Sequence, residues 1–189
     1  MTDTPATTPA SPGIHRFEDE ERRPHHDPRD AVDVDFDAIN DHNHYALWAV
    51  FRLASPLPAD DAARGRIVAE SAGFVEGTGV TTRGWYDVAG LRSDADLLIW
   101  WLDDDPERLQ DAYHRLRASA LGRHLEPVWS CMGLHPPAEF NRRHVPACFA
   151  GTAPRDWCMV YPFVRSYDWY LKAPDERARI MAEHGRNGF

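Results

Sequence analysis

The residues whose types could carry chemistry gather in the last quarter of the chain. His144 comes first, Tyr161 follows with Arg165 four residues later, and His184 lies near the end of an expected helix. An imidazole can act as a base near neutral pH or as an axial ligand of a haem iron, and a guanidinium matches a carboxylate. A tyrosine phenol can be oxidised. Together these groups indicate a haem site that reacts with peroxide.

Each of these residues also has a simpler explanation. His184 shares an apolar helix face with Ile and Met, so a core histidine is the interpretation that spacing alone favours. Tyr161 fits an ordinary strand residue, and His144 fits a solvated loop histidine. Arg165 fits a surface charge, and Trp169 fits core packing. From the residues alone, both sets of interpretations stay open.

Composition narrows the class of protein. The chain has 189 residues, of which 43% are hydrophobic, so it can bury the core of one domain or of two small halves. Its net charge of −9 and its lack of a long basic run argue against nucleic-acid binding. No signal peptide and no apolar run of roughly 20 residues is present, so we expect a soluble, cytoplasmic protein without a membrane span. Its three cysteines have no C-x-x-C spacing, which indicates reduced thiols.

Residues 1–40 are expected to form a disordered N-terminal arm. They contain five prolines, an acidic stretch and little apolar periodicity, so they cannot bury enough surface to offset the entropy of ordering. The pair His25 and His26, and the pair His42 and His44, could bind a metal adventitiously. No cysteine or third spaced ligand supports a zinc site, so we expect solvated histidines.

Residues 41–135 are expected to form an N-terminal ferredoxin-like half. Apolar and alternating patterns predict strands over 45–53, 80–88 and 97–102. Asp60 or Asp61 begins a helix that runs to about residue 73, and Asp105 with Pro106 begins a second helix. The order strand, helix, strand, strand, helix predicts an α+β fold of ferredoxin-like type.

Residues 136–189 are expected to hold a connecting segment and the start of a C-terminal half. A proline-rich connection with Pro127, Pro136 and Pro137, which begins before this range, should run over the surface or line a pocket. Strands are predicted over 157–164 and 167–171, and a helix over 174–184 with Gly185 just past its end. This order repeats the opening of the first half and then stops, so the second half is expected to be truncated. A fragment, an altered reading frame or a different architecture would each explain it.

The chain resembles a known family over about residues 45–185. Three motifs account for the resemblance: Tyr-Pro-Phe-Val-Arg-Ser-Tyr-Asp-Trp-Tyr, which begins at Tyr161, Pro-Asp-Glu-Arg, which begins at Pro174, and Met-Ala-Glu-His-Gly, which begins at Met181. They resemble the actinobacterial coproheme decarboxylases of the chlorite dismutase-like superfamily. The resemblance implies two ferredoxin-like halves in a dimeric α/β barrel, a homopentamer, and haem in the C-terminal half.

The same resemblance implies roles for the site residues. His184 would be the axial iron ligand, Tyr161 the redox-active tyrosine and His144 the distal base. Arg165 would contact a propionate, and Trp169 would be a neighbouring oxidisable ring.

The implied activity is the decarboxylation of iron coproporphyrin III (coproheme) to haem b in haem biosynthesis, with hydrogen peroxide as co-substrate. The iron porphyrin would be both substrate and redox cofactor. One alternative is chlorite decomposition or general peroxidase activity on the same fold, which would not require Tyr161. Another is a haem-binding or subunit-interaction remnant without activity.

Overall fold

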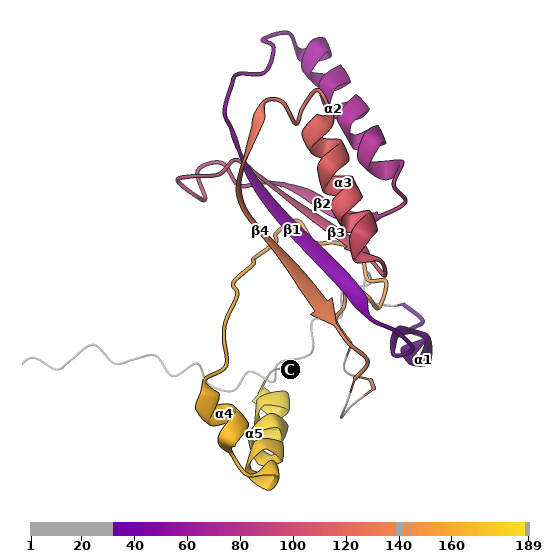
Figure 1. Cartoon of the computed structure of the whole chain (residues 1–189), viewed down its shortest axis with the longest axis vertical. Helices are drawn as coiled ribbons and strands as arrows, with labels where there is room; N and C mark the ends of the chain where they lie inside the picture. Colours follow the sequence, from indigo (N-terminus) through magenta and orange to yellow (C-terminus); the bar gives the residue numbers. More distant parts are fainter. Residues whose placement is uncertain (1–31, 139–141, 144, 188–189) are drawn as a thin grey trace, which may run out of the picture. The chain divides into compact units, whose positions relative to one another are not determined.

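The computed structural model describes residues 32–138, 142–143 and 145–187 (Figure 1). The described residues divide into two units, a first unit within 32–163 and a second within 164–187. The predicted domain boundaries near residues 40 and 135 stay predictions.

Most of the expected N-terminal arm lies outside the described residues. Residues 32–40 are described, and Phe36–Ile39 form the one-turn helix α1. The prediction of disorder is therefore wrong for residues 36–39. The carboxylate of Asp35 caps the helix by accepting the backbone N–H of Asp37 at 3.1 Å and of Ala38 at 3.0 Å. These two hydrogen bonds satisfy backbone N–H groups that have no partner within the first turn of a helix.

The first unit contains a four-stranded antiparallel sheet with the order β2-β3-β1-β4. Helix α2 connects β1 to β2, and helix α3 connects β3 to β4, which is the ferredoxin-like arrangement. The predicted α+β class is therefore confirmed. The elements are β1 (His44–Leu53), α2 (Asp61–Glu76), β2 (Thr81–Asp87), β3 (Leu97–Asp103), α3 (Pro106–Ala118) and β4 (Leu125–His135).

One face of the sheet is covered by the two helices, which lie side by side in Figure 1. Alternate residues of β1, including Leu47 and Phe51, point to this face because successive side chains of a strand alternate. They pack against Leu109, Ala112 and Leu116, which the helical period places on one side of α3. This cluster is the main core.

The opposite face of the sheet carries the other alternate residues. Trp48 of β1 and Trp100 of β3 stack there, with ring centroids 5.6 Å apart, next to the buried Val50 and Leu98. No helix of the first unit lies on this face in Figure 1. We call it the open face of the sheet.

The strand β4 was not predicted, because Pro127 made this stretch read as a connection. A proline cannot donate to a strand ladder and is tolerated at edges and bulges. Both conditions hold here: β4 is an edge strand, and Pro127 pairs with Phe51 where the register shifts. The prediction of a surface connection is therefore wrong for residues 125–135.

Two predicted strands of the C-terminal part are also wrong. Residues 157–164 have neither helix nor strand, and residues Tyr167–Leu171 form the short helix α4. A strand needs a partner for its backbone groups, and the described residues offer none to 157–164. The predicted helix is confirmed as α5, Pro174–Asn187, but it continues past Gly185, so Gly185 does not end it. None of the described helices is long and apolar enough to cross a membrane.

Candidate functional site

Tyr161 lies in an extended segment of the first unit, residues 157–163. Side chains alternate along this segment: Cys158 and Val160 pack against the cluster of the open face, while Trp157 and Tyr161 are exposed. The Tyr161 side chain is 71% exposed. Its hydroxyl is therefore accessible to a ligand, and the alternative of an ordinary strand residue does not hold because residue 161 lies outside any described strand.

Arg165 and Trp169 belong to the second unit, where the structure brings them together. The guanidinium carbon of Arg165 lies 5.1 Å from the centroid of the Trp169 ring, a cation–π contact. Trp169 lies on α4 and is half-buried, whereas Arg165 is exposed. The contact holds the guanidinium close to the ring without using its N–H donors, which stay available for a carboxylate.

His184 is an exposed residue on α5. The first turn of this helix contains Asp175 and Glu176, which oppose its positive end, and Lys172 Nζ contacts Glu176 Oε1 at 2.6 Å. The exposed imidazole does not fit the core-histidine interpretation that spacing alone favoured. His144, the predicted base, lies outside the described residues.

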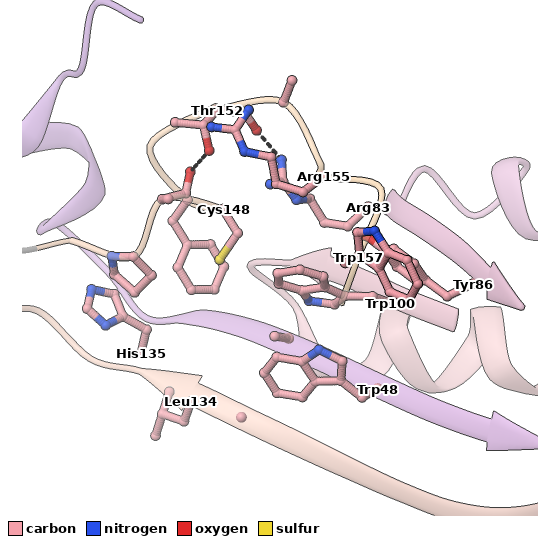
Figure 2. Close-up of a pocket in the computed structure, with 16 residues that line it drawn as sticks. Trp48, Arg83, Tyr86, Trp100, Leu134, His135, Cys148, Thr152, Arg155 and Trp157 are labelled. Atoms are coloured by element: carbon pink, nitrogen blue, oxygen red, sulfur yellow. Dashed lines mark hydrogen bonds between the residues drawn. The ribbon is translucent and has the colours of Figure 1, made fainter. Parts of the chain in front are cut away.

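A cavity of about 560 Å³ lies on the open face of the sheet (Figure 2). Trp48 and Trp100 form its floor, and the loop that includes Cys148 and Trp157 covers it. Its lining is mostly aromatic and aliphatic, with a small number of polar groups, which is typical of a site for a small molecule. The sequence predicted that the proline-rich connection runs over the surface or lines a pocket, and Gly133, Leu134, His135 and Pro146 do line this cavity, but its tryptophan floor was not predicted.

Arg83 from β2 is the central cation of the cavity. Its guanidinium donates to the backbone oxygen of Thr152 and lies 5.4 Å over the Trp100 ring. Thr152 in turn donates its hydroxyl to the Ala147 oxygen at 2.8 Å, which closes the loop (Figure 2). Within the described residues, Arg83 Nε and Trp100 Nε1 are buried donors without a hydrogen-bond partner.

Burial favours the neutral forms of the thiol and the phenol that line this cavity. Burial raises the pKa of the Cys148 thiol, and the nearby Arg83 only partly opposes this. Burial likewise raises the pKa of the Tyr86 phenol, with a smaller contribution from Cys158. A protonated thiol is a poor nucleophile, so the cavity is suited to binding rather than to covalent catalysis.

The cavity had a weak signal in the sequence. An arginine at position 83 interrupts a strand of otherwise uncharged residues from Thr81 to Tyr86, and Trp48 and Trp100 stand at alternate positions of two apolar strands. Nothing in the sequence places the loop of Cys148 over them, because that contact joins residues far apart in the chain. A tertiary structure was needed to find it.

Comparison with known proteins indicates the family to which this chain is related. A model of the chlorite dismutase family matches residues 64–189, more than half of the chain. Coproheme decarboxylase from Mycolicibacterium smegmatis is 48% identical over 156 residues, which make up 80% of this chain and 67% of that protein.

Solved structures agree at the level of the fold. Two mutants of chlorite dismutase from Candidatus Nitrospira defluvii superpose with a TM-score of 0.59, at 21% and 20% identity. They match 76% and 77% of this chain, and the matched parts make up 63% and 65% of those chains. The chain thus spans less than two thirds of those two structures, and with the family match over residues 64–189 it belongs to the chlorite dismutase family.

Proposed function

We propose that this chain takes part in the hydrogen-peroxide-dependent oxidative decarboxylation of iron coproporphyrin III to haem b, in haem biosynthesis. The observation that carries the proposal is the 48% identity to a relative named coproheme decarboxylase. The chain matches 67% of that relative's length and not the whole of it. The activity, the substrate and the partners are therefore proposed for this chain.

The residues present suit an iron porphyrin, which is a large, flat, apolar ring with carboxylates on its rim. The segment around Tyr161 exposes aromatic and aliphatic side chains, among them Phe163 and Val164. Exposed apolar surface of this kind marks a place that a ligand or partner covers. The exposed guanidinium of Arg165 and the exposed imidazole of His184 add a cation for a carboxylate and a ligand for iron.

The overall reaction balances with one peroxide for each propionate. A propionate side chain, hydrogen peroxide and one proton give a vinyl group, carbon dioxide and two waters. The propionate loses two electrons, and the peroxide gains them. When bound, the iron porphyrin supplies the centre at which peroxide is reduced, and the protein supplies binding, orientation and proton transfer.

Tyr161 is the proposed redox relay. Its phenol loses one electron and one proton to the oxidant derived from peroxide, and the tyrosyl radical then takes a hydrogen atom from the β-carbon of a propionate. This second transfer restores the phenol and leaves a radical on the β-carbon. That radical would give a second electron to the oxidant that the iron porphyrin and peroxide supply, while the bond to the carboxylate breaks, carbon dioxide leaves and the vinyl double bond forms. The exposure of the Tyr161 side chain supports the role, because its hydroxyl must reach the substrate.

The other residues have binding or proton-transfer roles in the proposal. His184 would hold the iron through its imidazole, Arg165 would pair with a propionate, and Trp169 holds the guanidinium of Arg165 through the cation–π contact. His144 is the base that takes a proton from hydrogen peroxide, since an imidazole titrates near neutral pH. The active form is proposed to be a cytoplasmic homopentamer, in which this chain supplies one ferredoxin-like half and the helices α4 and α5.

The test mixes the protein with iron coproporphyrin and peroxide and follows the products by mass spectrometry. Tyr161→Phe should bind the porphyrin as the parent does and form no vinyl product, because the ring stays and the transferable hydrogen is lost. Tyr113→Phe is the matched control, since Tyr113 packs against Phe51 on the helix side of the sheet. Equal yields from Tyr161→Phe and the parent would reject the relay.

Two further variants test the binding and base roles. His184→Ala should change the absorption spectrum of the bound iron, and an unchanged spectrum would reject the axial ligand. His144→Ala should slow the peroxide reaction roughly 10²–10⁴-fold at saturating porphyrin, as loss of a general base does. Oxygen release from chlorite without any vinyl product would favour the chlorite dismutase alternative instead.

A further inference from the structure

Three side chains with metal-binding atoms meet at one end of the sheet in the first unit. His42 lies two residues before β1, His44 is the first residue of β1, and Asp104 directly follows β3. Because β1 and β3 are antiparallel and Tyr45 pairs with Asp103, the start of one strand lies beside the end of the other. The sheet topology therefore supplies the third ligand that the sequence did not show.

We propose that His42, His44 and Asp104 form a binding site for a divalent transition-metal ion of the Zn²⁺ type. One ligand atom from each residue lies within 4.8 Å of the other two. Tetrahedral Zn²⁺ with ligands at 2.0–2.2 Å needs ligand atoms about 3.3 Å apart, so small side-chain rotations suffice. None of these three residues has a role in the proposed porphyrin reaction.

The orientation of His44 is the strongest argument for a metal. Its Nε2 donates to the backbone oxygen of Ile39 at 2.9 Å, and its ring stacks on Phe149 with centroids 5.0 Å apart. Histidines that bind metals commonly donate their other ring N–H to a backbone carbonyl, which fixes the tautomer and the ring. Facing the Asp104 carboxylate, Nδ1 then needs either a second ring proton or a bound cation, and the metal titration below distinguishes the two.

The other two ligands complete a site that is open on one side. His42 Nε2 lies 3.1 Å from one carboxylate oxygen of Asp104, and His44 Nδ1 contacts the other oxygen. Burial raises the pKa of Asp104, but its contacts with the two histidines outweigh this and the pKa is lowered, so the carboxylate is ionised at neutral pH. His42 and Asp104 are about half-exposed, which leaves room for water as a fourth ligand.

The donor set selects the class of metal. Two imidazole nitrogens and one carboxylate oxygen suit Zn²⁺ and its first-row neighbours, whereas Ca²⁺ and Mg²⁺ prefer oxygen ligands alone. Without a metal, the same cluster is an ion pair with two half-exposed members, which contributes little to stability. A bound ion would instead connect the start of β1 firmly to the turn between β3 and α3.

The experiment titrates the metal-stripped, porphyrin-free full chain with Zn²⁺ by calorimetry and repeats the titration with Co²⁺, whose visible absorption reports coordination by nitrogen. We expect one saturable site and a rise in melting temperature with Zn²⁺. His42→Gln and Asp104→Asn, both at half-exposed positions, should each weaken this binding roughly tenfold or more. His44→Gln removes a more buried ring, so the two exposed variants decide the outcome.

Two controls separate this site from other histidines. His114→Gln changes an exposed histidine on α3 and should leave Zn²⁺ affinity unchanged. A variant with His25→Gln and His26→Gln should also keep the binding. The proposal is overturned if no saturable site exists, if His42→Gln and Asp104→Asn bind Zn²⁺ like the parent, or if the variant at positions 25 and 26 loses the site.

Discussion

The sheet of the first unit and the segment after it contain similar side chains but bury them to opposite extents. Phe51 of β1 is 0% exposed, whereas Phe163 in the extended segment is 77% exposed. Trp101 of β3 is also 0% exposed, whereas Trp157 is 80% exposed. Residue type therefore does not determine burial in this chain.

The difference follows from what each region can pack against. Phe51 lies beneath α2 and α3, which the strand–helix–strand connections bring onto one face of the sheet. The segment 157–163 has only the open face of the sheet beneath it, so one side of the segment is covered and the other is not. A segment that is half-covered in this way is suited to meet a ligand, which is the role proposed for Tyr161.

The largest expected effect is the loss of stability when Phe51 is truncated, compared with the same truncation of Phe163. Phe51→Ala should lower the free energy of unfolding by about 3–5 kcal/mol, because it removes a fully buried ring and leaves a cavity. Phe163→Ala should change it by less than about 0.5 kcal/mol, since the ring is mostly in solvent. Urea unfolding followed by far-UV circular dichroism measures both. Similar losses for the two variants would show that the extended segment is as tightly packed as the core.

A smaller effect compares the starts of two helices. Asp105 caps α3 by accepting the backbone N–H of Glu107 at 2.8 Å, so Asp105→Ala should cost about 1 kcal/mol. Ser166 stands at the same position of α4 without a side-chain cap bond, so Ser166→Ala should be nearly neutral. Thermal unfolding of both variants checks this, and an equal destabilisation would contradict the contrast between the regions.

The reactivity of Cys148 and Cys158 tests whether the loop of Cys148 and the segment 157–163 pack against the open face of the sheet. Burial raises the pKa of Cys148 and of Cys158, so alkylation of the folded protein should be slow at pH 7 and should accelerate as the pH rises through the raised values. Because the thiols are harder to ionise when folded, the folded state should also lose stability in that alkaline range. Mass spectrometry after timed alkylation, with and without urea, gives the rates. Equal alkylation rates with and without urea would mean that packing against the open face does not protect these thiols.

The smallest expected effect concerns α5. Lys172 and Glu176 form an ion pair at 2.6 Å with both side chains about one third exposed. Such pairs contribute about 0.3–0.5 kcal/mol, so Glu176→Gln should slightly speed amide exchange in α5 and leave the exchange of β1 and β3 unchanged. Exchange that also rises in the sheet would show that the two units unfold together.

The sequence by itself determined the elements whose signals are local. The i, i+3, i+7 spacing of Leu109, Ala112 and Leu116 and the pair Asp105 and Pro106 predicted α3, because a helix bonds within its own segment. Local reasoning failed for the strand predicted over 157–164: burial alternates over 157–161, but no described strand pairs with the segment.

Only the tertiary structure decided the features that depend on distant residues. Pro127 is compatible with β4 because it pairs at a bulge with Phe51 of β1, and no local pattern contains that information. Asp104 became a partner of His42 and His44, sixty residues away, because β1 and β3 are antiparallel. Arg83 meets the loop of Thr152 for the same kind of reason. Local spacing sets how a segment folds, whereas strand pairing and packing set which segments meet.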